Sequence, residues 1–312
     1  MTKALVTGGC GFIGSHLVEA LAKKGIKVKV IDSLVKGRLE SIKHLINKGD
    51  VEFIEGDIRN RDSVDKAMKN IDYVFHMAAV HIQRSAESPE EAIDVNVKGS
   101  YNVFSSALEH NVKRVIFSSS SSVYGEPKKL PMSENSELNI VEPYGASKLM
   151  AENLLKFLST KGLKYNILRY FNVYGERQAI HAYYTTVIIH FVKRILNNEA
   201  PTIDGKGTQS MDFTHVSDVV DANILAMESK AENEIFNVGT GKSTTVKELA
   251  EILIKALGKN IEPIFKPREV LVTKRQADTT KAEKLLGFKA KISVEDGLKD
   301  VALKIKEHPE LY

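Results

Sequence analysis

The chain has 312 residues, of which 43% are hydrophobic, which is enough for one large globular domain or a large domain with a smaller partner. The formal net charge of +4 is too small and too evenly spread to predict binding to nucleic acid. The single cysteine, Cys10, excludes an internal disulfide, and no hydrophobic run reaches the roughly 18 residues that cross a bilayer. Because no signal-peptide pattern follows Met1, we expect a cytoplasmic protein that does not enter a membrane.

Short apolar runs alternate with helical patterns from the N-terminus onward. The runs expected to form strands are Ala4–Thr7, Lys27–Asp32, Val51–Asp57, Tyr73–Ala79, Arg114–Ser119, Tyr165–Phe171 and Glu234–Val238. Helices are expected at Ser15–Lys24, Ala92–His110 and Gly145–Thr160. This alternation predicts an α/β fold, a doubly wound Rossmann sheet of about seven parallel strands, with ligands at the carboxyl ends of the strands.

The regular alternation weakens after Phe171, where loop and helix patterns take over, with two helical stretches in the C-terminal part. We therefore expect a large dinucleotide-binding domain and a smaller, discontinuous α/β lobe that binds the substrate. The first is expected to comprise residues 1–171 and 214–239, and the second residues 172–213 and 240–312. Because no low-complexity linker separates them, the two parts are expected to share an interface, where ligand sites are common.

A glycine-rich turn follows the first expected strand and opens the first expected helix. It runs Thr7-Gly8-Gly9-Cys10-Gly11-Phe12-Ile13-Gly14, and it fits a dinucleotide fingerprint counted from either Gly8 or Gly9. Glycines permit the tight turn and let backbone N–H groups reach a pyrophosphate at the helix N-terminus. Asp32 ends the second strand, where a carboxylate can bond both ribose hydroxyls and repel a 2′-phosphate, so NAD is favoured over NADP.

Tyr144 and Lys148 are one helical turn apart at the start of an expected helix, so both side chains lie on one face. The ordinary pKa of tyrosine, near 10, is too high for a base at neutral pH, but a neighbouring ammonium and a cationic nicotinamide ring would lower it. The serine-rich run Ser118–Ser122 ends an expected strand and places hydroxyls beside the cofactor. The alternative is a serine turn that only bonds its own backbone.

Further motifs stand in register along nearly the whole chain. They are Thr7-Gly8-Gly9-x-Gly11-x-x-Gly14, Gly56-Asp57, His76-x-Ala78-Ala79, Asn96, Ser118-Ser119-Ser120-x-x-Val123-Tyr124-Gly125, Tyr144-x-x-x-Lys148, Arg169-Tyr170-Phe171-Asn172, Ala277-Asp278-x-x-Lys281-Ala282 and Leu285-Leu286-Gly287-Phe288. Together they resemble the extended short-chain dehydrogenase/reductases. Within that family the chain is most similar to UDP-sugar 4-epimerases of the UDP-glucose and UDP-galactose type.

The resemblance implies a role for individual positions. Ser120, Tyr144 and Lys148 would be the catalytic residues. NAD would be bound by Gly8, Gly11, Phe12, Ile13, Gly14, Asp32, Asp57, Ile58, Ala78, Ala79, Asn96, Ser118, Tyr144, Lys148, Tyr170 and Val173, with Asp57 and Ile58 flanking the adenine. The UDP-sugar would contact His81, Ser120, Tyr144, Asn172, Val187, Arg268 and Arg275, with Asn172 and Arg268 at its diphosphate.

The implied reaction is a transient oxidation. Tyr144 would take the proton of the C4 hydroxyl while hydride passes to NAD⁺, the 4-keto sugar would rotate about its diphosphate, and hydride would return to the other face. Because the net redox change is zero, the cofactor can stay bound throughout.

Two positions depart from the pattern that the resemblance implies. The resembling enzymes carry an arginine for the diphosphate within a Gln-x-Arg-Asp-Phe segment, where this chain has Met211. Another cation must compensate, with Arg177, Arg268 and Arg275 as candidates, or the diphosphate is held differently. Arg275 also aligns with a residue that gates the sugar pocket by its size, so it would leave less room for an N-acetyl group and would suit a uronic acid carboxylate. In the alternative interpretation Arg275 is a surface charge.

The nearest rival function is a nucleotide-sugar dehydratase on the same fold. In the related 4,6-dehydratases acidic residues follow the active-site hydroxyl, and here Ser121 and Ser122 take those places, which argues against 4,6-elimination. A 5,6-elimination or a decarboxylation stays open, as do UDP-uronic acids and UDP-N-acetylhexosamines as epimerase substrates. The retained Ser120, Tyr144 and Lys148 argue against a non-catalytic NAD-binding scaffold.

The nine histidines show no metal-ligand spacing, so no metal is expected, and the histidines are expected to be packing or surface residues. By analogy with relatives, the expected helices Ala92–His110 and Gly145–Thr160 would pair across a two-fold axis. A homodimer is therefore expected.

Overall fold

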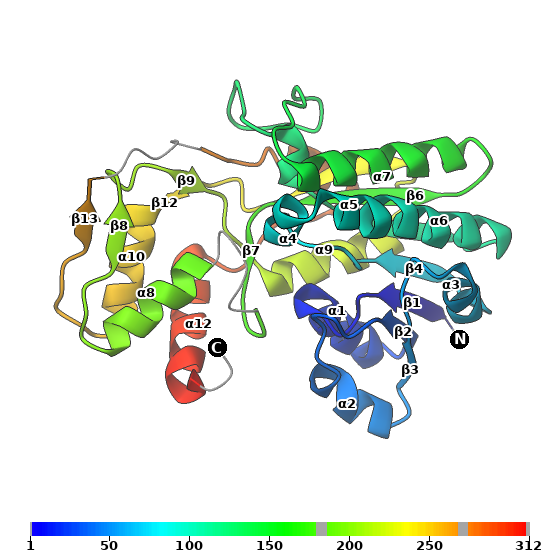
Figure 1. Cartoon of the computed structure of the whole chain (residues 1–312), viewed down its shortest axis with the longest axis horizontal. Coiled ribbons are helices and arrows are strands. Elements are labelled where there is room, and N and C mark those ends of the chain that lie inside the picture. Colours follow the sequence, from blue (N-terminus) through cyan, green and yellow to red (C-terminus); the bar gives the residue numbers. More distant parts are fainter. Residues whose placement is uncertain (1, 179–185, 268–273, 310–312) are drawn as a thin grey trace.

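Seven parallel strands form the central sheet of the computed structural model, which describes residues 2–178, 186–267 and 274–309 (Figure 1). In chain order they are β1 (Lys3–Thr7), β2 (Lys27–Asp32), β3 (Val51–Glu55), β4 (Tyr73–His76), β5 (Arg114–Ser120), β6 (Tyr165–Tyr170) and β11 (Glu234–Val238). Across the sheet their order is β3-β2-β1-β4-β5-β6-β11, and every neighbouring pair is parallel. The doubly wound Rossmann sheet expected from the sequence is confirmed.

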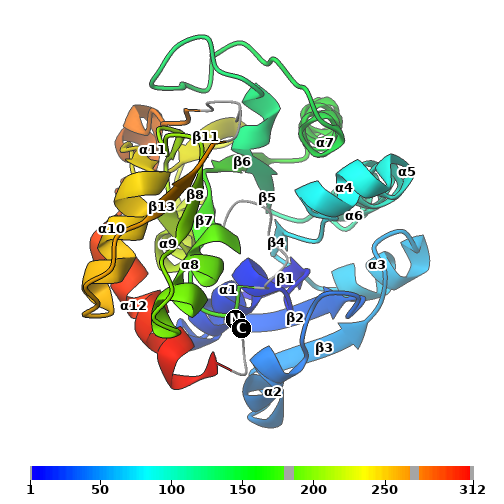
Figure 2. The same cartoon turned by 60° about the vertical axis from the view of Figure 1, so that its left-hand side comes forward.

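Helices cover both faces of the sheet, as Figure 2 shows. One face carries α1 (Phe12–Lys23), α2 (Glu40–Asn47), α9 (Val216–Glu228) and α11 (Thr280–Leu286), and the other carries α3 (Arg61–Met68), α6 (Ser100–Glu109) and α7 (Pro143–Ser159). Two cores result: the first lies between the sheet and α1, α2, α9 and α11, and the second lies between the sheet and α3, α6 and α7. Successive residues of a strand point to opposite faces, so Ala4 and Val6 of β1 join the first core and Leu5 joins the second. Because both faces are buried, strands inside the sheet such as β1 and β4 are largely apolar.

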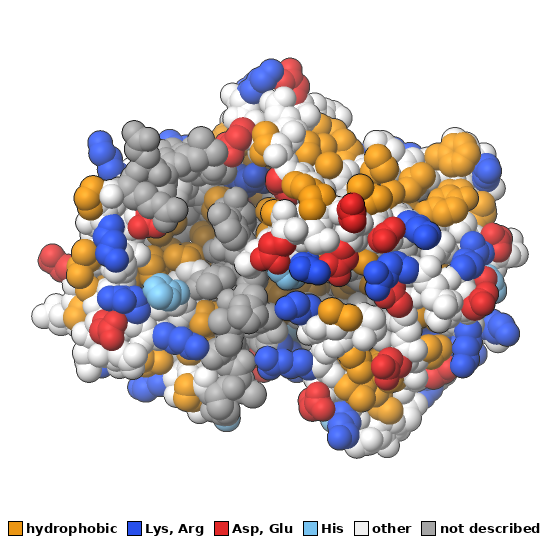
Figure 3. Space-filling model, in the orientation of Figure 1, with side chains coloured by type: hydrophobic (Ala, Val, Ile, Leu, Met, Phe, Trp, Pro, Cys, Tyr) orange, Lys and Arg blue, Asp and Glu red, His pale blue; other side chains and the backbone are white. Residues whose placement is uncertain are grey.

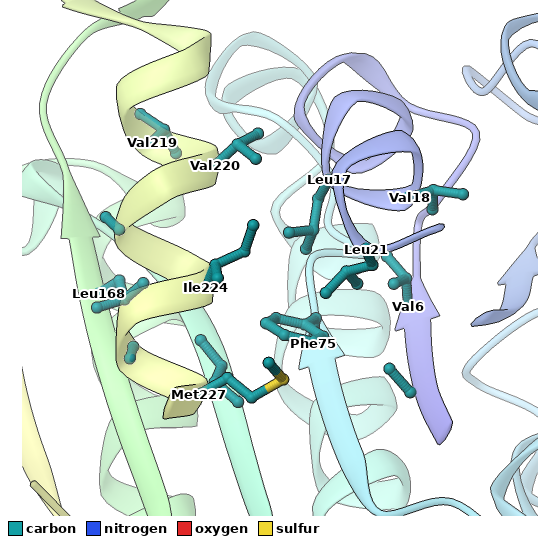
Figure 4. Packing of buried hydrophobic residues seen from close by; sticks show 14 of the residues in the cluster. Val6, Leu17, Val18, Leu21, Phe75, Leu168, Val219, Val220, Ile224 and Met227 are labelled. Carbon is teal, nitrogen blue, oxygen red and sulfur yellow. The ribbon is translucent and has the colours of Figure 1, made fainter. Parts of the chain in front are cut away.

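The first core is closed by contacts between α1 and α9. Figure 4 shows Ile224 and Met227 of α9 facing Leu21 of α1, with Phe75 of β4 between the two helices. Burying an aliphatic or aromatic side chain of this size contributes about 1.5–3 kcal/mol. This packing fixes α1, and with it the glycine turn that precedes α1, against the sheet.

Two helices begin earlier than the sequence pattern predicts. α1 begins at Phe12 rather than Ser15, because Gly11, within the glycine turn, takes the N-cap position. α7 begins at Pro143 rather than Gly145, because proline lacks an N–H and suits the first helical position. Tyr144 therefore lies inside the first turn of α7.

The helix expected at Ala92–His110 is composed of three pieces. They are α5 (Pro89–Ala92), a π-helical stretch over Ile93–Gly99, and α6. In a π-helical turn the backbone hydrogen bonds span five residues instead of four, so the α-helical hydrogen-bond pattern is interrupted. The apolar side chains still fall on one face of the helix. For that reason the hydrophobic periodicity predicted one continuous helix.

A separate core holds the C-terminal lobe, which lies to the left in Figure 1. It is formed by α8 (Thr186–Leu196), α10 (Val246–Ala256) and α12 (Val294–Glu307), with the short strand pairs β8 (Thr202–Asp204) and β13 (Ile264–Lys266), and β9 (Ser210–Met211) and β12 (Thr244–Thr245). Three helices, not the two expected, follow residue 245 in the described chain. One of them, α11, packs Ala282 and Leu286 into the first core of the sheet, so 240–312 does not lie wholly in the lobe core.

The buried carboxylate of Asp212 joins separate segments of the lobe. It accepts hydrogen bonds from the N–H groups of Thr240 at 2.8 Å, Gly241 at 2.9 Å and Ala277 at 3.1 Å. Burial raises the pKa of Asp212, and these hydrogen bonds oppose that effect. Three stretches that are distant in the sequence therefore meet at one side chain.

A buried ion pair fastens α7 to the sheet. Arg169 of β6 and Glu152 of α7 are 2% and 0% exposed, and Nη2 of Arg169 lies 2.7 Å from Oε2 of Glu152. The hydroxyl of Ser119 donates a further hydrogen bond to Oε1 of Glu152 at 2.6 Å. The carboxylate thus links β5, β6 and α7 behind the carboxyl edge of the sheet.

We expect Arg169→Met to lower the free energy of unfolding by about 3–5 kcal/mol, because it leaves the Glu152 carboxylate buried without its cation. Urea unfolding at neutral pH measures the change. Lys255→Ala is the matched control, since Lys255 and Glu295 form an exposed pair worth less than about 1 kcal/mol. Equal effects of the two substitutions would contradict the assignment of a stabilising role to the buried pair.

Candidate active site

The glycine turn between β1 and α1 provides a surface shaped for a phosphate group. Gly8 has φ +70°, and a Cβ there would lie 2.8 Å from the backbone nitrogen of Ala78, so the position requires glycine. A Cβ on Gly14 would collide with the carbonyl oxygen of Gly8. No side chain caps the N-terminus of α1, and its first turn has no acidic residue. The free N–H groups and the positive end of the helix dipole fit an anionic pyrophosphate.

Asp32 lies at the end of β2 next to this turn, as expected. Its Oδ2 accepts a hydrogen bond from the N–H of Cys10, and its Oδ1 accepts one from the N–H of Leu34, both at 2.9 Å. The carboxylate is almost wholly buried and fixed in orientation by these bonds. The predicted contact with a ribose would add to this structural role.

The residues expected at the adenine have partners of their own. The carboxylate of Asp57 forms an ion pair with Arg59, with Oδ2 2.6 Å from Nη2, and this hydrogen bonding lowers the pKa of Asp57. The side chain of Ile58 is buried in the second core and approaches Gly99. The flanking of adenine by Asp57 and Ile58 stays a prediction.

The loop after β4 carries the expected cofactor residues Ala78 and Ala79. Ala78 lies against Gly8 of the glycine turn, and Ala79 is exposed. Asn96 is buried, and its side chain accepts a hydrogen bond from the N–H of Val80 at 2.7 Å and donates one to the carbonyl of Val80 at 3.1 Å. Asn96 therefore fixes the end of this loop.

Ser120, Tyr144 and Lys148 meet at the carboxyl end of β5. Lys148 donates a hydrogen bond from Nζ to the carbonyl of Ser118 at 2.8 Å, and the Ser120 side chain favours the ionised form of the Tyr144 phenol. The Lys148 ammonium lies 5.8 Å from the centre of the Tyr144 ring. The structure thus brings together the three residues that the sequence predicted to be catalytic.

Glu142, which the sequence analysis did not single out, holds the first turn of α7. Its Oε2 and Oε1 accept hydrogen bonds from the N–H groups of Tyr144 and Gly145, both at 2.7 Å. Glutamate directly before Pro143 is a recognisable helix-start pattern, because the carboxylate can cap the N–H groups that follow the proline. Glu142 therefore fixes the backbone of Tyr144.

Burial moves the two predicted acid/base groups in opposite directions. It lowers the pKa of Lys148 to about 7, with the Glu152 carboxylate opposing the shift. It raises the pKa of the Tyr144 phenol, and the negative charge of Glu142 adds to this, while the Ser120 side chain opposes it. Without a further positive charge nearby, Tyr144 is a neutral phenol at physiological pH.

The remaining expected cofactor residues lie on β5, β6 and β7 (Val173–Tyr174). The hydroxyl of Ser118 lies 2.9 Å from that of Tyr170, and Asn223 of α9 donates to the same Tyr170 hydroxyl at 2.8 Å. Asn223 is a partner that the sequence gave no reason to single out. Val173 pairs with Thr214 in a short parallel ladder and packs against the first core.

The expected substrate residues are distributed over both parts of the chain. The imidazole of His81 caps α4 (Ile82–Glu87) by accepting a hydrogen bond from the N–H of Arg84 at 3.5 Å. Asn172 donates to the carbonyl of Asp212 at 3.5 Å, and Val187 packs partly against the lobe core. Arg268 lies outside the described residues.

The two positions that depart from the family pattern differ in their surroundings. Met211 is buried in the lobe core, where it supplies packing and no charge. Arg177 is paired with Glu19 of α1 at 2.7 Å. Arg275 is half-buried and donates a hydrogen bond from Nη1 to the carbonyl of Ser121 at 3.1 Å, so its guanidinium lies beside the serine turn and is not a freely exposed surface charge.

We expect the buried Lys148 to make stability depend on pH. Its pKa is about 7 in the folded protein and near 10.5 in the unfolded chain, so between these values the unfolded chain binds more protons and stability rises with pH. The Cys10 thiol acts oppositely above pH 9, because burial raises its pKa to about 12. Urea unfolding of the NAD-free protein from pH 7 to 9 should therefore show wild type gaining stability relative to Lys148→Met, whereas parallel curves would contradict the burial of an ionisable lysine.

Comparison with known proteins gives the family. Residues 4–239 match the sequence profile of the NAD dependent epimerase/dehydratase family. The putative UDP-glucose 4-epimerase of Methanocaldococcus jannaschii is 40% identical over 302 residues, which are 95% of this chain and 96% of that protein. The UDP-glucose 4-epimerase of Thermotoga maritima, solved with UDP-glucose, superposes with a TM-score of 0.91 at 37% identity, covering 99% of this chain and 100% of that one.

A second solved structure, the UDP-N-acetylglucosamine 4-epimerase of Methanobrevibacter ruminantium in complex with UDP-N-acetylmuramic acid, also gives a TM-score of 0.91 at 37% identity. It covers 98% of this chain and 99% of that one. Both the profile match and these full-length similarities include the glycine turn and the segment from Ser118 to Lys148. The chain therefore belongs to the NAD-dependent epimerase/dehydratase family of extended short-chain dehydrogenase/reductases.

Proposed function

We propose that the chain is a UDP-sugar 4-epimerase that interconverts UDP-glucose and UDP-galactose. The observation that carries this proposal is the assembly of Ser120, Tyr144 and Lys148 at the carboxyl end of β5, on the same sheet edge as the uncapped N-terminus of α1. One group can exchange a proton as an alcohol becomes a ketone, and the dinucleotide site lies on the same edge of the sheet. This combination suits the reversible oxidation of a sugar hydroxyl. The names of the similar enzymes from M. jannaschii and T. maritima support the choice of sugar.

In this mechanism Tyr144 exchanges the proton of the sugar C4 hydroxyl. Ser120, whose side chain favours the ionised phenol, shares that proton and orients the sugar oxygen. Lys148, held by the Ser118 carbonyl, favours the tyrosinate form of Tyr144, which must be present before the residue can take the C4 proton. NAD, which the glycine turn and Asp32 would hold, would supply the hydride acceptor and donor for the C4 position. Tyr144 then gives its proton back to the C4 oxygen.

The NAD and the UDP-sugar are assigned to different parts of the chain in this proposal. Residues 1–171 and 214–239 bind NAD, and residues 172–213 and 240–312 bind the UDP-sugar, with the packing of α11 on the sheet as an exception within the second set. Since Met211 is buried and Arg177 is paired with Glu19, Arg268 and Arg275 are the remaining candidates for the diphosphate.

Among the described residues, none beside Tyr144 is a suitable acid for the rival dehydratase chemistry. The carboxylate beside it in the described chain, Glu142, has both oxygens engaged by backbone N–H groups of α7. Ser121 is buried, and its carbonyl accepts the hydrogen bond from Arg275. These observations favour epimerisation over loss of water.

We expect purified protein to convert UDP-glucose and UDP-galactose into each other without added reductant, and Tyr144→Phe to lower kcat by at least about 10³-fold, because the proton acceptor is lost. Chromatography of a panel of UDP-hexoses, UDP-uronic acids and UDP-N-acetylhexosamines measures the conversion. NAD binding should survive in Tyr144→Phe, which separates lost chemistry from lost cofactor. A product lighter by one water would overturn the epimerase proposal in favour of a dehydratase.

Arg275 offers a test of sugar choice within the same panel. Its guanidinium lies beside the catalytic serine turn, and Nε has no hydrogen-bond partner within the described part of the chain. We expect Arg275→Leu to raise the activity on UDP-N-acetylhexosamines relative to UDP-hexoses, because a shorter apolar side chain leaves more room. A wild-type preference for UDP-glucuronic acid that disappears in Arg275→Leu would instead identify the uronic acid as the substrate.

We also propose that the protein is a cytoplasmic homodimer built on the π-helical stretch, α6 and α7. Ile93, Tyr101, Met150 and Phe157 are 58%, 43%, 54% and 53% exposed. Figure 3 shows hydrophobic side chains gathered over this part of the surface. Met150 and Phe157 lie two turns apart on one face of α7, so a second copy could bury them together. Within the described ranges no helix is long and apolar enough to cross a membrane.

We expect the double substitution Met150→Asp and Phe157→Asp to produce monomers, because two carboxylates would be buried without partners at the interface. Sedimentation velocity of wild type and variant measures the oligomeric state. Leu303→Asp, on an exposed position of α12, is the control that should leave the mass unchanged. A wild type that sediments as a monomer would contradict the homodimer.

A further inference from the structure

His76 lies at the end of β4, between the glycine turn and the second core, and it is fully buried. Its ring meets Phe104 edge-on at 5.2 Å between centroids and stacks on Phe117 at 5.5 Å. Both ring nitrogens also have polar partners: Nδ1 lies 2.7 Å from the hydroxyl of Thr7, and Nε2 lies 2.8 Å from the hydroxyl of Ser100. His76 is therefore not a simple packing residue.

The hydrogen-bond directions around His76 follow from its neighbours. The hydroxyl of Ser100 donates to the carbonyl of Asn96 at 2.5 Å, so it must accept its bond from His76 Nε2–H. Nδ1 then carries the lone pair and accepts the hydroxyl hydrogen of Thr7. The ring is neutral, since burial lowers the pKa of His76 to about 3 and the Lys148 charge adds to this effect.

On one side this chain of hydrogen bonds reaches the dinucleotide site. The Thr7 hydroxyl, with its hydrogen directed at His76, accepts the N–H groups of Met77 and Ala78, each at 3.2 Å. Thr7 directly precedes Gly8, and Gly8 itself packs against Ala78. One hydroxyl thus holds the glycine turn and the loop after β4 in a fixed relative position.

On the other side this series of hydrogen bonds reaches the helix α7, which carries Tyr144. The side chain of Asn96, in the π-helical stretch, bonds both the N–H and the carbonyl of Val80 at the end of the loop after β4. Its Nδ2 also donates to the hydroxyl of Ser147 at 3.0 Å. Ser147 in turn donates to the carbonyl of Tyr144 at 2.8 Å. The path from Thr7 to the backbone of Tyr144 is therefore continuous.

A second, aromatic contact joins the same two places. The Lys148 ammonium lies 5.0 Å from the centre of the Phe117 ring, and Phe117 stacks on His76. A cationic imidazole would repel Lys148, so the neutral ring is compatible with the ammonium close by.

We propose that His76 is a positioning residue that sets the distance and orientation between the dinucleotide turn and the catalytic helix α7. It does so through hydrogen bonds to Thr7 and Ser100, with stacking on Phe117 as a separate contribution. The inference rests on the proposed function where it concerns turnover, and on the NAD site alone where it concerns cofactor binding. Small misplacements of reacting groups cost large factors in rate, so a rigid connection between the two sites has a direct catalytic value.

Two substitutions separate the polar and aromatic contributions. His76→Phe keeps the stack and removes both hydrogen bonds, whereas His76→Gln keeps a donor and an acceptor and removes the stack. We expect His76→Phe to raise the NAD⁺ dissociation constant by roughly tenfold and to lower kcat at saturating NAD⁺ by roughly tenfold, since two buried hydrogen bonds are lost. His76→Gln should stay within about threefold of wild type in both. NAD⁺ binding by calorimetry and turnover of the UDP-sugar measure these values well below the unfolding temperature.

Ser106→Ala is the matched control. Ser106 lies on α6, as Ser100 does, and its buried hydroxyl donates a hydrogen bond to Asp65 of α3, away from the path to Tyr144. It should lower stability without changing NAD⁺ binding or kcat. If His76→Phe behaves like Ser106→Ala, losing stability alone, the positioning role is wrong. Should His76→Phe fail to fold, Ser100→Ala breaks the same path, and wild-type kcat and NAD⁺ affinity in that variant would also overturn the proposal.

NAD⁺ binding and turnover are measured separately, so a failure of the positioning role can be told from a failure of the proposed function. If wild type converts none of the UDP-sugars, the epimerase proposal fails, and the NAD⁺ affinities of His76→Phe and His76→Gln still decide the inference. If wild type is an epimerase and both variants bind NAD⁺ and turn over normally, only the inference fails.

Discussion

The parallel register of β1, β4, β5 and β6 is the constraint on which the rest of the structure depends. Because these strands run side by side in one direction, their carboxyl ends share one edge, and each end delivers one part of the site. β1 leads into the glycine turn, β4 leads into the loop of Ala78, and β5 ends at Ser120. Residues as far apart in the chain as Thr7 and His76 therefore become neighbours through strand pairing alone.

Burial then sets the chemistry at that edge. Tyr144 is a neutral phenol and the pKa of the Lys148 ammonium is lowered, because burial, nearly complete for Lys148 and partial for Tyr144, disfavours each charged form. In such surroundings a charge that arrives or leaves acts strongly on its neighbours. The site is therefore sensitive to the charge of its cofactor, which suits an enzyme that must move a proton in both directions with little net driving force.

The sequence predicted the sheet, the glycine turn and the grouping of Ser120, Tyr144 and Lys148, because each depends on local periodicity or on motifs at strand ends. It did not predict what depends on contacts between distant segments. The π-helical stretch conserves the apolar face, so periodicity cannot reveal it, and the pairing of Asn223 with Tyr170 joins two elements with no shared motif. The roles assigned to individual cofactor and substrate residues stay predictions.

The carboxylate of Asp212 has a consequence for how this chain can be divided. Three backbone N–H groups, from Thr240, Gly241 and Ala277, converge on it, so the lobe is closed only after the chain has returned from β11 and passed through α10 and β13. A fragment that stops before Ala277, or a chimaera that takes only 172–213 from another enzyme, would leave a buried carboxylate incompletely bonded. Exchange of substrate specificity between relatives by recombination must therefore transfer these segments together, which makes the lobe a single inherited unit despite its interrupted sequence.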